Sequence, residues 1–168
     1  MVQQALEDGR ATAGPSTDQE RPLRGYAVLM GVFASLAGAF SLWLRSTGRK
    51  LPERVDPGDL AVLTVATHKA SRLLTKDKVT STVRAPFTRF QANEGAGEVS
   101  EAARGTGVRR ALGELLVCPY CVAMWIAAGF AAGLVVAPRA TRLAASVLTI
   151  LFGSDLLQIA YRKAEDTL

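Results

Sequence analysis

Cysteine and histidine are scarce in this sequence, whose 168 residues include two cysteines and one histidine. Two cysteines cannot build the disulfide framework of a small secreted protein. One chain also lacks the four Cys or His ligands of a structural zinc site. We therefore expect neither a disulfide-rich secreted protein nor a self-sufficient metalloprotein.

The sequence also lacks a phosphate-binding loop, because its glycine-rich stretch at residues 91–107 has no Gly-Lys-Ser/Thr ending. The net charge of +5 could suggest a nucleic-acid partner. Membrane proteins, however, gather Lys and Arg on one side for insertion alone. We expect no nucleic-acid partner, and since no motif specifies a reaction, we expect a non-enzymatic component.

Long apolar runs are what the sequence does contain. Residues 26–44 and 115–137 carry no charge, and residues 143–161 carry only Asp155. Each run reaches the roughly 20 residues that cross a hydrocarbon core of about 30 Å. The pattern predicts a multi-pass protein of the cell membrane.

A fourth helix is predicted over residues 60–75, with Asp59 as its N-cap. Its first half is apolar, and its second half contains His68, Lys69 and Arg72. At 1.5 Å per residue it reaches about 24 Å, which suits either a short tilted span or a half-buried surface helix. The fold class expected is an all-α membrane bundle of three spans plus one short span.

Three regions are predicted along the chain. Residues 1–22 have no apolar periodicity and form a disordered tail. Residues 26–44 form an additional transmembrane helix; Ala37-Gly38-Ala39 has the form of a leader cleavage site, but the run continues to Leu44, which favours a retained span. Residues 60–161 form the main membrane domain.

The main membrane domain contains a polar loop at residues 76–114. Its stretch 91–107 is rich in Gly, Ala, Glu and Ser and predicts flexibility, and a short helix follows at 108–117. The basic side chains expected to face lipid headgroups or a protein partner are Lys76, Lys78, Arg84 and Arg89.

The distribution of basic residues predicts the orientation. If residues 60–75 span the membrane, twelve basic residues lie on the side of the 76–114 loop and six on the other; if not, the division is fifteen against five. Both divisions place the loop and the C-terminus in the cytoplasm.

The sharpest local motif is Cys118-Pro119-Tyr120-Cys121, whose letters match the active-site motif of glutaredoxins. A helix N-terminus lowers the pKa of a redox thiol, but the βαβ framework of those enzymes is absent here. Two protomers could instead contribute four cysteines to a shared Zn or Fe–S site. Simple packing of two small side chains at a helix start is the third interpretation.

Asp155 is an acid about 9 Å below the end of its predicted span, at 1.5 Å per residue. A carboxylate at that depth needs a partner, and we expect His68, Lys69 or Arg72 to supply it. Exposure to water in a crevice is the simpler alternative. A less favoured hypothesis is an oligomeric transporter or pore that uses Asp155.

Gly129 and Gly133 form a GxxxG pattern in the third run, which allows close approach of another helix. That contact could lie within the bundle or between two copies in a homo-oligomer.

Four segments of the sequence form an ordered set: Ala66-Thr67-His68-Lys69-Ala70-Ser71-Arg72-Leu73-Leu74, Asp77-Lys78-Val79, Val83-Arg84-Ala85-Pro86-Phe87 and Gly113-Glu114-Leu115-Leu116-Val117-Cys118-Pro119-Tyr120-Cys121 with Trp125. Together they resemble one bacterial family, domain of unknown function 1360 (DUF1360), whose members are short membrane proteins, some labelled as sporulation-associated. The resemblance covers about residues 60–160, omits the first span, and departs at Lys69, where an Arg is expected. It implies a shared set of His68, Arg72, Asp77, Arg84 and the two cysteines, but no reaction.

Overall fold

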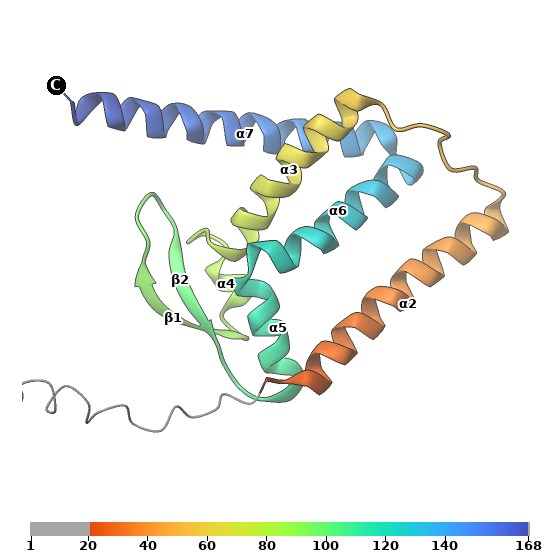
Figure 1. The fold of residues 1–168 in the computed structure, drawn as a ribbon, viewed down its shortest axis with the longest axis horizontal. Helices are drawn as coiled ribbons and strands as arrows, with labels where there is room; N and C mark the ends of the chain where they lie inside the picture. The colour runs from red at the N-terminus through yellow and green to blue at the C-terminus, as the bar shows by residue number, and fades with distance from the viewer. Residues whose placement is uncertain (1–20, 168) are drawn as a thin grey trace, which may run out of the picture.

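The computed structural model describes residues 21–167, which form six helices and one two-stranded sheet (Figure 1). In chain order the elements are α2 (Leu23–Thr47), α3 (Pro57–Thr75), α4 (Ser81–Arg84), β1 (Thr88–Asn93), β2 (Val99–Ala103), α5 (Gly107–Val117), α6 (Pro119–Val136) and α7 (Pro138–Glu165). The tail predicted for residues 1–22 lies outside the described residues, apart from Arg21 and Pro22.

Three helices are long and apolar enough to cross a membrane: α2, α6 and α7. The runs 26–44 and 143–161 lie within α2 and α7, so those two predictions are confirmed for the helices themselves. The run 115–137 is divided at Cys118, because its first three residues belong to α5 and α6 covers only Pro119–Val136.

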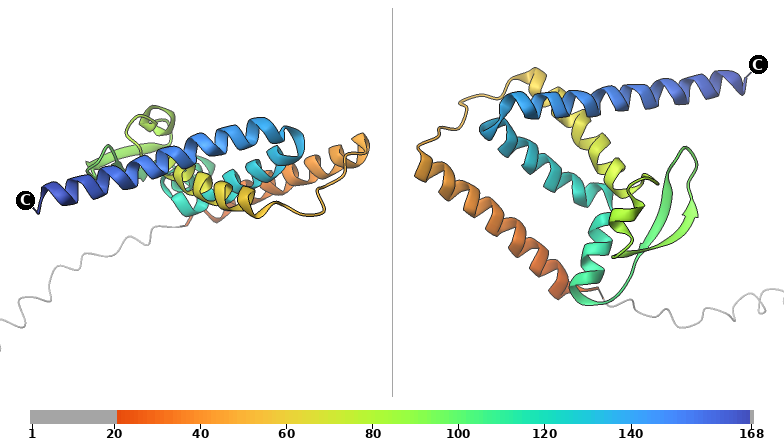
Figure 2. Two further views of the ribbon diagram at one scale, coloured as in Figure 1. Left: turned by 90° about the horizontal axis from the view of Figure 1, so that it is seen from above. Right: turned by 180° about the vertical axis from the view of Figure 1, so that it is seen from behind.

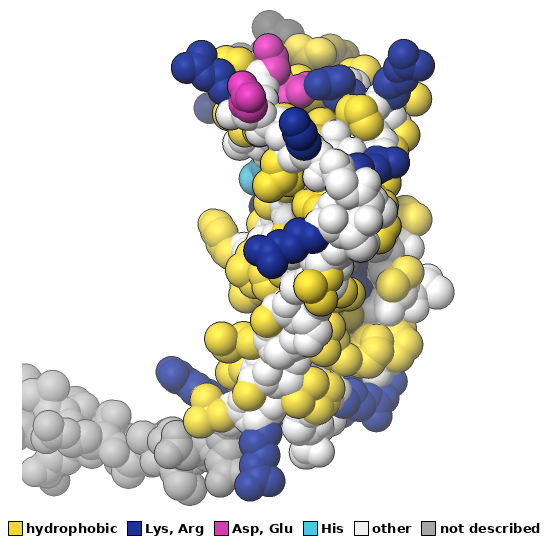
Figure 3. Space-filling model, turned by 90° about the vertical axis from the view of Figure 1, so that its right-hand side faces the viewer, with side chains coloured by type: hydrophobic (Ala, Val, Ile, Leu, Met, Phe, Trp, Pro, Cys, Tyr) yellow, Lys and Arg dark blue, Asp and Glu magenta, His cyan; other side chains and the backbone are white. Residues whose placement is uncertain are grey.

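Large apolar side chains on these three helices are exposed, including Met30 at 73% and Leu157 at 73%. Figure 3 shows exposed hydrophobic side chains over the whole height of one face. Such a surface suits a hydrocarbon solvent rather than water.

The helices α3, α6 and α7 pack against one another, whereas α2 makes its main contact with α5 (Figures 1 and 2). Gly25 makes the α2–α5 contact close, because a Cβ there would lie 2.6 Å from the Ala111 Cβ and 2.8 Å from the Gly107 carbonyl oxygen. Higher along α2, Phe33 meets Trp125 of α6 edge to face, with ring centroids 5.0 Å apart. One residue without a side chain therefore allows α2 to dock on α5.

The end of α2, the start of α3, the end of α6 and the start of α7 gather on one side of the molecule, whereas the end of α7 projects alone (Figure 1). Arg142 at the start of α7 pairs with Asp59 at the start of α3, with 2.7 Å between Nη2 and Oδ2. Arg49 after α2 donates to the carbonyl of Val136 at the end of α6. These contacts bring residues 45–59 and 136–142 together, and the starts of α2 and α6 lie at the opposite end with α5.

The fourth predicted helix exists but begins earlier than expected. It starts at Pro57, and its N-cap is Asp56, whose carboxylate accepts from the backbone N–H groups of Gly58 and Asp59. Pro57 explains the shift, because proline is favoured at the first helical position, directly after the cap. The prediction of Asp59 as the N-cap is wrong, and the carboxylate of Asp59 accepts hydrogen bonds from Arg142 instead.

The description as all-α was not exact, because residues 88–103 contain an antiparallel hairpin. The flexible stretch predicted at 91–107 overlaps both strands, and Val99 within it is only 1% exposed. Its glycines make the turn rather than a mobile linker: Gly95 and Gly97 have φ values of 67° and 85°. Positive φ at these positions favours glycine. The glycine content of this turn therefore resembles that of a flexible linker, which is why the sequence predicted flexibility.

Backbone hydrogen bonds fix the hairpin to the end of α3. The N–H of Lys78 donates to the Gly97 carbonyl, and the N–H of Val99 donates to the Lys76 carbonyl. Residues 76–117, which comprise α4, the hairpin and α5, are called the cap below. The cap is therefore a folded unit at one end of the helices rather than a loop.

Candidate functional site

Arg84 lies at the centre of the cap, with 1% of its surface exposed. Its Nε and Nη2 donate to the carboxylate of Glu101, at 2.8 and 3.3 Å. The remaining donors bind the carbonyls of Leu74 and Asp77 and the hydroxyls of Thr80 and Ser81. A single guanidinium thus joins the end of α3, the helix α4 and strand β2.

This burial corrects the prediction that Arg84 faces lipid headgroups. A guanidinium has five donors, and the fold satisfies them internally instead of leaving them to solvent. Of the other basic residues, Lys76 pairs with Glu94 at 3.1 Å, while Lys78 and Arg89 are exposed. The prediction of contact with lipid headgroups therefore remains only for the exposed side chains of Lys78 and Arg89.

Glu101 is the buried counter-ion, with its side chain 5% exposed. Burial by itself would raise the pKa of this carboxyl group, but hydrogen bonds from Arg84, Thr88 and Ser81 outweigh it and hold the pKa below its ordinary value of 4.5. The ionised form is therefore part of the folded cap. The stability of the folded cap therefore depends on pH in the acidic range.

A polar cleft of about 420 Å³ lies between α3, α7 and the turn of the hairpin. Its charged and polar lining residues are His68, Lys69, Arg72, Asp77, Glu98, Asp155, Gln158 and Arg162. The cleft brings together three of the shared residues of the resemblance and Asp155. Residues of α3 and α7 that are 86 positions apart in the sequence meet there.

Two ion pairs cross this cleft. The ammonium of Lys69 contacts the carboxylate of Asp155, which matches the expectation that one of three α3 residues partners this acid. Arg72 makes a bidentate contact with Glu98, with Nη2 at 2.6 and 2.5 Å from the two carboxylate oxygens. His68 instead packs edge to face on a ring of α7, with centroids 5.4 Å apart.

Asp77 has a local role within the cleft wall. Its carboxylate accepts from the N–H of Val79 at 3.0 Å, and its backbone bridges to Glu98. The hydrogen bond stabilises the turn from α3 into α4.

Glu98 and Glu101 were missed by sequence reasoning, although they are the partners of Arg72 and Arg84. A buried arginine such as Arg84 needs a carboxylate, and the half-exposed Arg72 also pairs with one. The cap contains five acids: Asp77, Glu94, Glu98, Glu101 and Glu114. This requirement could have limited the candidate partners of Arg72 and Arg84 to those five acids. It could not have identified which acid pairs with which arginine.

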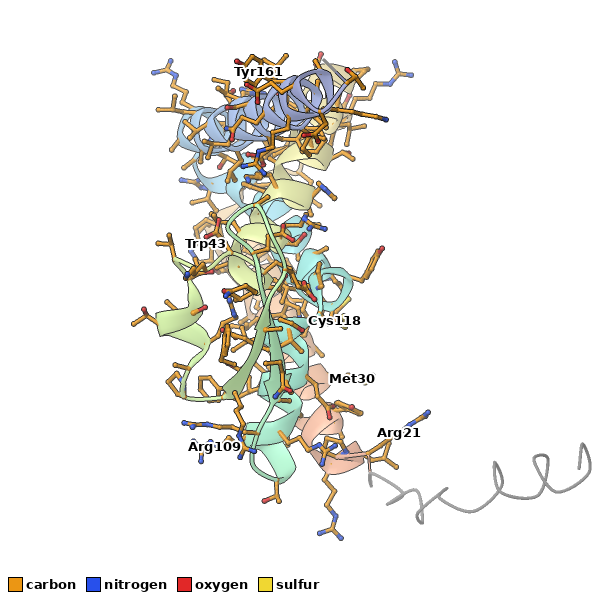
Figure 4. All side chains as sticks on the ribbon, turned by 90° about the vertical axis from the view of Figure 1, so that its left-hand side faces the viewer. Arg21, Met30, Trp43, Arg109, Cys118 and Tyr161 are labelled. Atoms are coloured by element: carbon orange, nitrogen blue, oxygen red, sulfur yellow. A yellow bond between two sulfur atoms is a disulfide. The ribbon has the colours of Figure 1, made fainter. Side chains whose placement is uncertain are left out.

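The two cysteines form a second site at the junction of α5 and α6, where Figure 4 labels Cys118. Cys118 is the N-cap of α6, and its sulfur accepts from the N–H of Cys121 at 3.2 Å. The two sulfurs lie at disulfide distance. Within residues 21–167 no group of three or more His, Cys, Asp or Glu side chains could hold a metal ion, so a shared metal site would require a second copy.

The two glycines of the GxxxG pattern have different surroundings. A Cβ at Gly133 would lie 2.6 Å from the Thr141 hydroxyl oxygen, so this glycine packs within the chain at the α6–α7 turn. A Cβ at Gly129 would meet nothing within 4 Å. Self-association through this face stays a prediction that rests on Gly129.

The family model described as "Protein of unknown function (DUF1360)" matches residues 62–161. The chain belongs to this family. The DUF1360 segment runs from α3 through the cap to α7, so it includes the polar cleft, the Arg84–Glu101 pair and both cysteines, and it omits α2. No curated protein and no solved structure matches the chain.

Proposed function

We propose that this DUF1360 protein is a multi-pass component of the cell membrane whose helices α2, α3, α6 and α7 cross the bilayer four times. The gathering of the end of α2, the start of α3, the end of α6 and the start of α7 on one side of the molecule supports this proposal. At 19 residues, α3 reaches about 28 Å at 1.5 Å per residue, close to the thickness of the hydrocarbon core. It lies beside α6 and α7, whose lengths suit a span.

The charges at the two ends support a cytoplasmic cap. The end that holds residues 45–59 and 136–142 has six basic residues: Arg45, Arg49, Lys50, Arg54, Arg139 and Arg142. The end that holds the cap has twelve when the tail and the C-terminus are counted with it. The positive-inside rule then favours a cap in the cytoplasm.

At this surface the cap acts as an adaptor that holds anionic lipid headgroups. Exposed basic side chains on this side include Arg24, Lys78 and Arg89. Arg21 and Arg109 project from the same end of the molecule (Figure 4). Each basic side chain near an anionic leaflet contributes about 1 kcal/mol to binding.

Phosphatidylglycerol binding to the purified protein, measured by native mass spectrometry at low and high salt, tests the adaptor. Replacement of Arg24, Lys78 and Arg89 by Gln is expected to weaken binding on the order of 100-fold at low salt. The matched control replaces Lys50, Arg54 and Arg139, which are equally exposed at the other end. Equal losses in both variants would contradict a specific role for the cap.

A second candidate function is thiol–disulfide exchange at the cytoplasmic membrane face. It is favoured by the two sulfurs at disulfide distance and by the position of Cys118 at a helix N-terminus, which stabilises a thiolate. Mass spectrometry of alkylated protein should show that Cys118 and Cys121 convert reversibly between two thiols and one disulfide. Two thiols that never pair over a titration with glutathione would contradict it.

A further inference from the structure

An apolar groove of about 540 Å³ lies between α2 and α6, and Cys121 is part of its wall. Four aromatic side chains also line it: Tyr26, Phe33, Tyr120 and Trp125. Volumes of 300–1,000 Å³ with an apolar, aromatic lining are typical of small-molecule sites. The groove therefore places a planar, apolar molecule directly beside a sulfur of the Cys118–Cys121 pair.

The redox chemistry of the Cys118–Cys121 pair indicates which class of molecule would bind in the groove. A disulfide facing the cytoplasm needs an oxidant, because soluble thiols there keep cysteines reduced. An oxidant that dissolves in the bilayer could reach Cys121 through the groove without passing through the cytoplasm. Aromatic side chains favour a planar ring by stacking or edge contacts.

One end of the groove is polar and suits a ring that can carry a hydroxyl group. There the hydroxyl of Tyr26 donates to the carboxylate of Glu114, whose other oxygen accepts from Arg110 at 3.0 Å. This chain of hydrogen bonds connects the groove with the charged groups of α5. A ring hydroxyl can donate to the oxygen of Tyr26 at this end, while the tail of the molecule lies along α2 and α6.

We propose that the groove binds a membrane quinone, which oxidises the Cys118–Cys121 dithiol to the disulfide. The two S–H bonds break and one S–S bond forms. Two electrons and two protons pass to the quinone, whose carbonyl groups become the hydroxyls of a quinol. Cys121 faces the quinone because its side chain lines the groove, and Cys118 completes the disulfide. This inference rests on the second candidate function.

Anaerobic mixing of the reduced, detergent-solubilised full chain with a short-tailed ubiquinone tests the step. One quinol per disulfide is expected, measured by ultraviolet absorbance and by thiol counting. Cys118→Ser and Cys121→Ser should each abolish quinol formation. A parallel reaction with oxidised glutathione separates the two claims: oxidation by glutathione alone overturns the quinone site, and oxidation by neither reagent overturns thiol exchange as well.

A groove-filling variant locates the site. Ala34→Trp in the groove is expected to slow the quinone reaction at least tenfold while the glutathione reaction is unchanged. Ala131→Trp, which fills the separate apolar cavity between α3 and α6, is the matched control. Equal rates in both variants would overturn the placement.

Fluorescence provides an independent measurement that does not depend on filling the groove. Quinone should quench Trp125 saturably in Trp43→Phe protein, because Trp125 lines the groove. It should not quench Trp43 saturably in Trp125→Phe protein, because Trp43 stacks on Phe40 in the last turns of α2, away from the cysteines. Saturable quenching of Trp43 alone would overturn the proposal.

Discussion

Arg84 shows how one residue can determine the structure of a whole segment. Its guanidinium and the Glu101 carboxylate are removed from solvent together, with 1% and 5% of the side chains exposed. Removing one member of such a pair leaves the other charged and buried, whereas replacing both costs much less. The pair is therefore sensitive to single substitutions.

Arg84→Met should lower the free energy of opening of the cap by about 3–5 kcal/mol, because it strands the Glu101 carboxylate. Hydrogen exchange of the β1 and β2 amides, followed by mass spectrometry, measures this opening. Arg89→Met, an exposed position on the neighbouring strand, is the control and should change it by less than about 0.5 kcal/mol. Similar effects at both positions would mean that Arg84 is not buried as described.

The lowered pKa of Glu101 predicts a direction for the pH dependence of the cap. In the unfolded chain the Glu101 carboxylate becomes protonated as the pH falls through about 4.5. In the folded cap it stays ionised at lower pH than this. Stability from the pair is thus complete at neutral pH and is lost as the pH falls below about 4.5, through the folded pKa. Thermal midpoints by circular dichroism should fall in this range, and less so in Glu101→Gln. A variant with the same acid dependence as wild type would contradict this assignment.

Asp155 illustrates what a single residue type reveals in a membrane sequence. A charge within an apolar run demands a partner, and the sequence alone limits that partner to three side chains within residues 60–75. The choice of Lys69 over His68 and Arg72 depends on the packing of α3 on α7. Arg72 is engaged by Glu98 of the hairpin, a contact that no local pattern indicates.

At the scale of elements, the longer helices were predictable, whereas the short helix α4 and the hairpin were not. Long apolar runs and proline starts specify α2, α6 and α7 locally. The hairpin has no apolar alternation: β1 buries only Thr88, and β2 buries only Val99. Its stability comes from contacts with distant segments, namely α5 and the end of α3. Composition alone therefore indicated a linker.

The docking of α2 on α5 gives a prediction at the same scale. Gly25→Ala should destabilise the protein by about 1–3 kcal/mol, because the new methyl group would overlap Ala111 and the Gly107 carbonyl. Gly31→Ala, on the same helix with open space around it, should be neutral or slightly stabilising. Unfolding midpoints in detergent compare the two. Equal midpoints would contradict the close α2–α5 contact.

At the scale of the whole molecule, the two ends differ in what they carry. One end has the extended connection 48–56 and the turn at Ala137, and it pairs Arg142 with Asp59. The other has the folded cap, the polar cleft and the cysteines. The basic residues predict an orientation, which stays a prediction. Hydropathy does not predict the number of crossings, because α3 is too polar to be identified in this way.

The four-span topology is the central claim, and residues 50 and 89 test it most directly. In a Cys118→Ser, Cys121→Ser background, Lys50→Cys and Arg89→Cys each provide one labelling site on either side of α3. We predict that a membrane-impermeant maleimide labels Lys50→Cys in intact cells and labels Arg89→Cys only in inverted vesicles. Labelling of both from the same side would show that α3 does not cross the membrane and would contradict the account.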